Sequence, residues 1–216
     1  MKKLLLLIVS AILLSSCTHT ITITELYKQD NIDFNKIKEA KITFAGTKNI
    51  SLREFKKTFN DEYSDTTKLD KYIYNSFVNL FALNMPKAQI LLADRKIPAE
   101  LFGEVSFKTA NINNVKNYFE NCKSDYLLII KNIDIANMYV SYSTGKSFSS
   151  IEYCLIKLEF EYWDVLNQKK IITATAPGMC AVGLFNYLET LNGAIDDAVK
   201  NATTYISENG TAQFVK

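Results

Sequence analysis

The chain has 216 residues, 48% of them hydrophobic, with 25 basic and 23 acidic side chains. That length fits one domain or two small ones, and the apolar content supports a sizeable core, which excludes a disordered chain. The 7 glycines and 3 prolines exclude a collagen-like chain, and a net charge of +2 gives no indication of nucleic-acid binding. The single histidine, His19, excludes most histidine-based catalysis and zinc chemistry.

The first residues have the layout of a secretory signal. Lys2 and Lys3 make a positive head, residues 4–14 are apolar except for Ser10, and small residues follow. As a helix the apolar run would rise ~16 Å, about half of the ~30 Å hydrocarbon core of a bilayer. A permanent transmembrane helix is therefore the weaker interpretation, and the sequence predicts a signal peptide at residues 1–16.

The residues Leu14-Ser15-Ser16-Cys17 resemble the lipobox of bacterial lipoproteins. The resemblance implies that the Cys17 thiol receives a diacylglyceryl group, that the signal is cut before Cys17, and that the new amine is acylated. Two or more acyl chains anchor a protein stably, whereas a single chain gives only reversible membrane binding. An ordinary cleaved signal followed by an incidental cysteine is the alternative.

The residues around the cleavage point also bear on location. Removal of Lys2 and Lys3 would leave equal numbers of basic and acidic side chains, so no basic surface for a membrane or a nucleic acid is expected. By the sorting rule of Gram-negative lipoproteins, Thr18 implies the outer membrane. Residues 18–22 lack the acidic cluster that some lineages use for surface export, which favours the periplasmic face.

The segment after the lipobox is polar. Residues 17–40 are predicted to be the lipidated N-terminus and a tether, with the Thr-Ile-Thr-Ile-Thr alternation at 20–24 as a candidate edge strand. Residues 41–46 predict the first core strand, ended by Gly46. Residues 47–66 are polar and charged, and fit either a short helix or a long loop.

Apolar residues at helical spacing predict helices over 67–84 and 111–121. The first of them begins with a capping-box pattern that pairs Thr67 with Asp70. Residues 89–93 between the two helices are nearly all apolar, which is typical of a short strand covered on both faces.

Three antiparallel strands are predicted next. Residues 125–135 begin a long strand, whose extension to 142 is left open, and residues 143–147 form a turn. Residues 154–162 alternate between apolar and polar side chains as a half-buried strand does. A hairpin turn at 164–168 then leads into a strand over 170–176.

A long amphipathic helix over 183–207 ends the predicted fold, with Asn209-Gly210 as its cap. Together these elements predict an α/β (α+β) fold: a single small, mostly antiparallel sheet with helices packed on it. We expect one domain over 41–208 and a tail at 209–216.

Two segments resemble a known group of envelope proteins. Residues 122–129 are similar to the segment of this group in which a helix ends and Asp-Tyr leads into an apolar strand. Residues 158–164 are similar to the segment in which a strand is followed by Asp and a hairpin. The group includes the outer-membrane activators of penicillin-binding proteins, the curli secretion lipoprotein and the N-terminal domain of the Tol-system propeller protein. The resemblance implies a common architecture over about residues 41–207, but fold does not fix function.

Three cysteines remain besides Cys17, namely Cys122, Cys154 and Cys180. They allow at most one disulfide, whose pairing the sequence leaves open, and their spacing matches no zinc or redox motif. Because Cys154 lies in an apolar alternation, we expect it to be a buried structural residue.

No convincing catalytic or cofactor motif is present. Thr144-Gly145-Lys146-Ser147 matches the end of a phosphate-binding loop, but the preceding glycine and the following helix are missing, so a β-turn is expected. Residues 178–183 are interpreted as a flexible loop rather than an anion site. Asp61-Glu62 and Asp196-Asp197 are interpreted as solvated surface charge, and no metal or cofactor is predicted.

Aromatic residues provide the best candidate for a partner surface. Tyr139, Tyr142, Phe148 and Tyr153 cluster around the turn predicted at 143–150, although edge-strand and core packing would also explain them. We therefore expect a non-enzymatic accessory or assembly lipoprotein that acts through protein–protein contacts in the envelope. The alternatives are a lipoprotein that binds a lipid or small molecule in an aromatic cavity between sheet and helices, and a hydrolase based on lysine, serine or acid chemistry.

Overall fold

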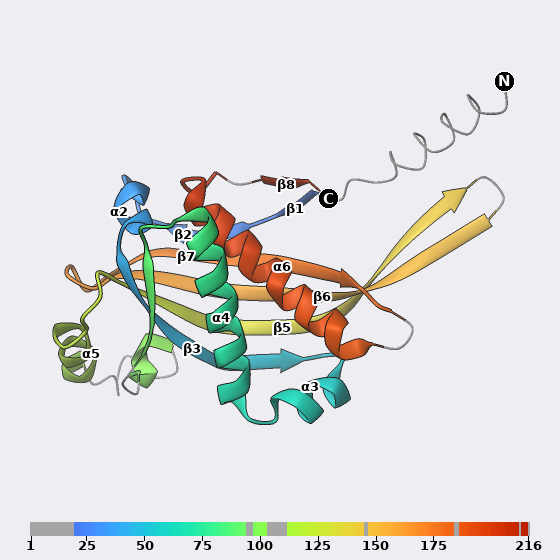
Figure 1. Ribbon diagram of the computed structural model, residues 1–216, viewed down its shortest axis with the longest axis horizontal. Coiled ribbons are helices and arrows are strands. Elements are labelled where there is room, and N and C mark those ends of the chain that lie inside the picture. Colours follow the sequence, from blue (N-terminus) through green and yellow to red (C-terminus); the bar gives the residue numbers. More distant parts are fainter. Residues whose placement is uncertain are drawn as a thin grey trace, which may run out of the picture.

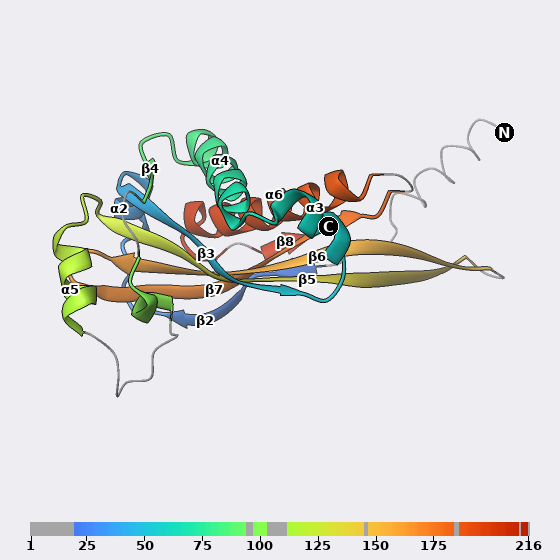
Figure 2. The same ribbon diagram turned by 90° about the horizontal axis from the view of Figure 1, so that it is seen from below.

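The computed structural model describes residues 20–93, 97–102, 112–144, 147–183, 186–211 and 213–215. Helices pack on a twisted sheet, and the last helix crosses the strands obliquely on one face (Figures 1 and 2). The predicted α+β class is therefore confirmed, as are the mostly antiparallel sheet and the long C-terminal amphipathic helix.

Six strands form the main sheet in the order β2-β7-β6-β5-β3-β4. They are β2 (Thr24–Lys28), β3 (Lys41–Leu52), β4 (Gln89–Leu92), β5 (Tyr126–Thr144), β6 (Ser147–Asp164) and β7 (Lys169–Ala181). The strands from β2 to β5 pair antiparallel, whereas β3 lies parallel to both β5 and β4. A second, two-stranded sheet joins β1 (Thr20–Thr22) to β8 (Gln213–Val215).

The helices cover the two faces of the sheet unequally. They are α2 (Phe34–Lys38), α3 (Lys56–Tyr63), α4 (Thr66–Asn84), α5 (Ile112–Glu120) and α6 (Tyr187–Ser207), together with the 3₁₀ helix η1 (Ala99–Phe102). α4 and α6 lie across one face (Figure 2). On the opposite face, α5 and η1 cover only one end, where Leu101 and Phe119 pack on Leu127 and Ile129 of β5.

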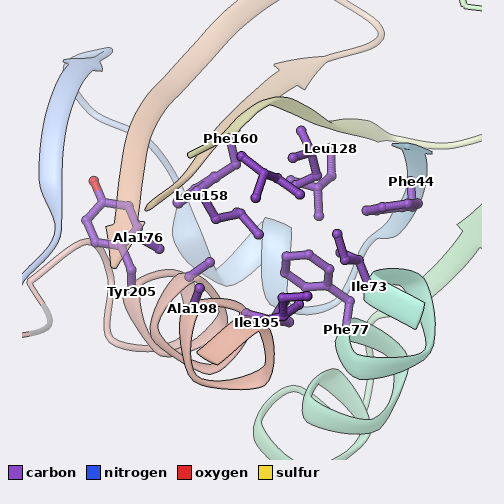
Figure 3. Packing of buried hydrophobic residues seen from close by; sticks show 14 of the residues in the cluster. Phe44, Ile73, Phe77, Leu128, Leu158, Phe160, Ala176, Ile195, Ala198 and Tyr205 are labelled. Atoms are coloured by element: carbon purple, nitrogen blue, oxygen red, sulfur yellow. The ribbon is translucent and has the colours of Figure 1, made fainter. Parts of the chain in front are cut away.

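The main core lies between the sheet and the two long helices (Figure 3). Phe44, Leu158 and Phe160 of the sheet meet Phe77 of α4 and Ile195 of α6, and all five side chains are buried. Burying one such side chain stabilises a fold by roughly 1.5–3 kcal/mol. Side chains therefore fill the space in which the sequence suggested an aromatic cavity.

The structure differs from the prediction of a tether over residues 17–40. Residues 24–28 form strand β2 at the edge of the main sheet, and α2 follows with Phe34 and Ile37 buried in the core. Two apolar residues in a polar stretch were too weak a pattern to indicate this helix. The C-terminal residues 213–215, expected to be a tail, pair with β1.

Strand β3 continues past Gly46 instead of ending there. Gly46 has a φ of 67° and lies where the pairing of β3 with β5 shifts register, so the glycine forms a bulge within the strand. The Asp70 carboxylate accepts a hydrogen bond from the Thr47 backbone N–H at 2.6 Å, which ties α4 to this bulge. The N-cap of α4 is Asp65, which accepts from the Thr67 N–H, rather than Thr67 itself.

Strand β4 was predicted to be covered on both faces, but it lies at the edge of the sheet and is partly exposed. It pairs only with β3, and Leu92 is 53% exposed. An apolar run of four residues indicates a strand, but it does not distinguish an edge position from a central one.

Helix α6 packs directly against the backbone of β7 at Gly178. A Cβ atom at this position would lie 2.2 Å from the Ala194 carbonyl oxygen and 2.3 Å from the Ala198 nitrogen. Both atoms belong to the helix backbone and cannot move without shifting the helix. Gly178 is therefore part of strand β7, and the prediction of a flexible loop over 178–183 was wrong for residues 178–181.

We expect Gly178→Ala to lower the free energy of unfolding by about 3 kcal/mol, because the added methyl group forces α6 off the sheet. Gly183→Ala is the control, since nothing lies within 4 Å of a Cβ atom there, and we expect it to change stability by less than about 0.5 kcal/mol. Urea unfolding of both variants tests this. Equal losses in the two variants would contradict the packing described above.

Candidate interaction surface

The most prominent feature of the molecule is a long hairpin formed by β5 and β6. The two strands have 19 and 18 residues, and they pair from Tyr126 opposite Asp164 to Thr144 opposite Ser147. Figures 1 and 2 show that the end of this hairpin projects beyond the sheet and the helices. Strand β6, not a helix, begins at Ser147, as predicted, and Gly145 and Lys146 lie outside the described residues.

The structure places all four predicted partner-surface residues on the two strands of this hairpin. Tyr139 lies opposite Glu152 and is 63% exposed, whereas Tyr153 is half-buried opposite Met138. Because successive residues of a strand point to opposite faces, Tyr139 and Tyr153 lie on different faces of the hairpin. Tyr142 and Phe148 belong to the strands, but their side chains lie outside the described part of the structure.

An apolar groove of about 620 Å³ lies at the base of the hairpin. Leu155 and Lys157 of its wall alternate with Cys154, Ile156 and Leu158, which pack in the core beneath α6. The groove is therefore on the helix-free face of the sheet. Its lining residues are Thr22, Thr24, Met138, Tyr139, Val140, Ser141, Leu155, Lys157, Thr175, Pro177 and Met179.

A polar cleft of about 540 Å³ lies beside the same hairpin base and includes residues from α3 and α6. The Asn137 side-chain amide donates a hydrogen bond to the Glu152 carboxylate in its wall. Its other lining residues are Glu54, Phe55, Lys56, Lys57, Thr58, Asp61 and Tyr187. The hairpin base thus has an apolar hollow and a charged hollow, and the sequence analysis indicated neither of them.

A buried carboxylate lies farther along the helix-free face. Glu161 of β6 is 3% exposed, and its oxygens accept from Lys170 Nζ at 3.1 Å and from the Trp163 indole N–H at 2.9 Å. Lys131 Nζ lies 4.0 Å away and Thr173 Oγ1 donates at 3.5 Å. These contacts compensate for the loss of hydration on burial, so the group is a structural ion network.

We expect Glu161→Gln to lower the free energy of unfolding by about 2 kcal/mol, because it leaves the two lysines and the indole without their charged acceptor. The partial exposure of both lysines keeps the effect below that of a fully buried pair. Glu159→Gln, two residues earlier on the same strand, should cost less than about 0.5 kcal/mol. Chemical denaturation tests the pair, and an unchanged midpoint for Glu161→Gln would contradict the network.

The paired acidic residues turn out to have structural contacts. Asp196 accepts hydrogen bonds from the Tyr72 hydroxyl at 2.8 Å and from Ser76 Oγ at 2.6 Å, and so links α6 to α4. Asp197 accepts from the Met179 backbone N–H at 2.8 Å and links α6 to β7. Asp196 is exposed, as predicted for solvated surface charge, whereas Asp197 is half-buried against β7. The sequence did not indicate the hydrogen bonds that both residues make, because it does not show which elements pack beside a helix.

The cysteines lie in two places. Cys122 Sγ is 3.1 Å from Ser124 Oγ near the start of β5, whereas Cys154 and Cys180 are opposite each other on β6 and β7. Cys154 is fully buried, as predicted, and burial raises the pKa of its thiol to about 12. A thiol held in this protonated form is a poor nucleophile, which fits a packing role.

Within the described ranges, no group of three or more His, Cys, Asp and Glu side chains is placed to hold a metal ion. Among the same residues, no helix is both long and apolar enough to cross a membrane. Cys17 and His19 lie outside the described residues.

No protein-family model matches the chain, and none of the curated proteins matches it. Several solved structures are similar to it at low identity. A minor lipoprotein from Acinetobacter baumannii has 12% identity and a TM-score of 0.41, with 82% of this chain and 98% of that chain covered. Lipoprotein GNA1162 from Neisseria meningitidis has 13% identity and a TM-score of 0.32, with coverages of 76% and 98%. PelC from Paraburkholderia phytofirmans, a dodecamer, has 9% identity and a TM-score of 0.39, with coverages of 83% and 96%. Likeness at this level says nothing about shared activity.

Proposed function

We propose that this chain is a lipid-anchored protein of the bacterial cell envelope that acts, without catalysis, by contacting another protein through the β5–β6 hairpin. The observation that carries the proposal is the projection of this hairpin beyond the body of the domain (Figure 1). The residues Leu14-Ser15-Ser16-Cys17 support the anchor.

The hairpin has the properties of a contact surface. Its strands continue two central strands of the sheet, so its base is held by pairing to β3 on one side and β7 on the other. It carries an exposed tyrosine, Tyr139, and its base borders the apolar groove. Tyrosines and apolar hollows of this kind form the centres of protein interfaces, because they bury much area for little loss of side-chain entropy.

The anchor limits where such a partner lies. Thr20, the first residue of β1, follows Cys17 by three positions, and three residue steps span at most about 11 Å. A lipid on Cys17 would therefore keep the domain next to the bilayer, where it could meet partners in the envelope. Thr18 and the lack of acidic residues after Cys17 favour the outer membrane and its periplasmic face.

The proposal gives these carboxylates a structural role. Glu161, Asp196 and Asp197 each make hydrogen bonds that hold elements of the fold together. The proposal therefore assigns the function to the hairpin surface and not to a cluster of acidic groups.

The anchor is tested by the mass of the mature protein. We expect the native chain to begin at Cys17 with acyl groups attached and to fractionate with the outer membrane, because two or more acyl chains bind a bilayer stably. Intact-protein mass spectrometry and gentle cell fractionation measure both. An unmodified amino terminus, or a protein recovered in the soluble fraction, would overturn the anchor.

The contact surface is tested by site-specific photo-crosslinking in intact cells. With a photoreactive amino acid at Tyr139, we expect one specific envelope protein to be captured, because this side chain lies on the projecting hairpin. The same amino acid at Leu166, 87% exposed in the turn between β6 and β7, is the matched control and should capture no such partner. Identical products from both positions, or none from Tyr139, would count against the proposal.

A further inference from the structure

The apolar groove at the hairpin base lies within reach of position 17. Thr22 and Thr24 form part of its wall, and Thr22 follows Cys17 by five residues. A fully extended chain spans at most about 3.6 Å per residue, so five residues reach about 18 Å. A group attached to the Cys17 side chain is therefore held close to this groove.

The wall of the groove suits a hydrocarbon chain. Met138, Val140, Leu155 and Met179 supply aliphatic and thioether surface on the face of the sheet that α4 and α6 leave uncovered. Methionine side chains are unbranched and adapt to a flexible ligand. The volume of about 620 Å³ falls within the range of roughly 300–1,000 Å³ that is usual for sites of small apolar ligands.

The one charged residue in the wall is compatible with such an occupant. Lys157 is exposed at the groove, so its methylene groups extend the apolar wall while its ammonium group stays in water. The polar residues Thr22, Thr24 and Thr175 also line the groove, toward the side from which the N-terminal segment arrives.

We infer that this groove receives one acyl chain of the lipid on Cys17 of the same molecule when that lipid is outside a bilayer. The inference rests on the lipid anchor proposed above. An acyl chain in water exposes a large apolar area, and the groove is an apolar surface that the short N-terminal segment allows it to reach. In a membrane the chain lies in hydrocarbon instead, and the groove is open for another contact.

The test uses a fatty acid that carries a photoreactive diazirine, supplied to growing cells so that it becomes attached to Cys17. The full-length mature protein is purified, the detergent is removed at low protein concentration, and the sample is irradiated and digested. We expect mass spectrometry to find adducts concentrated on segments 138–141, 155–157 and 175–179. Adducts spread evenly over the surface, or concentrated elsewhere, would overturn the inference.

Two variants give a matched comparison. Leu155→Lys places a charge in the groove and should reduce the groove adducts by about tenfold, because hydrocarbon does not compensate for the desolvation of an ammonium group. Leu166→Lys makes the same change at an exposed turn and should leave the adducts as in the wild type. If Leu155→Lys does not fold, the adduct map of the wild type alone decides the question.

Further outcomes separate this inference from the anchor itself. Labelled protein is mixed with isotopically heavy protein that carries no photoreactive label, which shows whether an acyl chain fills the groove of its own molecule or of another one. Adducts on heavy peptides would overturn the same-molecule assignment. An acylated protein without groove adducts overturns only the groove site. A protein whose intact mass shows no acyl group overturns the anchor, and the groove site with it.

Discussion

The continuous pairing of β5 with β6 is the constraint on which the rest of the structure depends. It provides the centre of the sheet, because β3 adds to β5 on one side and β7 to β6 on the other. Within the body, Leu128, Ile130, Leu158 and Phe160 alternate toward the helices and form the floor of the main core. Beyond the body the same pairing continues without helices, and there it forms a projecting surface. One hydrogen-bonded ladder therefore produces both the core and the candidate site.

The two faces of the sheet have different chemistry because only one of them is covered along its length. The face under α4 and α6 is closely packed, and at Gly178 the helix backbone comes so near that no side chain fits between. The other face has three zones in succession: an apolar patch under α5 and η1, the ion network around Glu161, and the groove at the hairpin base. The groove is the zone of this face that is left open for contact.

Most of the architecture was predictable from local patterns, and the failures have physical causes. Alternation over residues 154–162 and helical spacing over 67–84 and 183–207 indicated the central elements, because burial on one face imposes those periods. The hydrophobic pattern did not show that residues 24–38 join the domain. A short edge strand and a five-residue helix bury too few side chains to produce a recognisable period. Likewise, the bulge at Gly46 was taken for a strand end, because a glycine ends a strand in one context and bends it in another.

The candidate site was predictable only in part. The aromatic residues around the 143–147 turn drew attention to the hairpin, but no sequence pattern indicates that it extends beyond the body or that Thr22 and Met179 meet beside it. Such a groove arises from strands distant in sequence, and its shape depends on the twist of the sheet.

The pairing of β1 with β8 has a mechanical consequence. Thr22 at the end of β1 and Thr24 at the start of β2 both line the groove, and β1 also pairs with the C-terminal strand β8. A pull on the amino terminus would thus be borne first by the three residue pairs of this small sheet and only then by β2 on β7. Under such a load the strands of the small sheet can separate while the main domain stays folded.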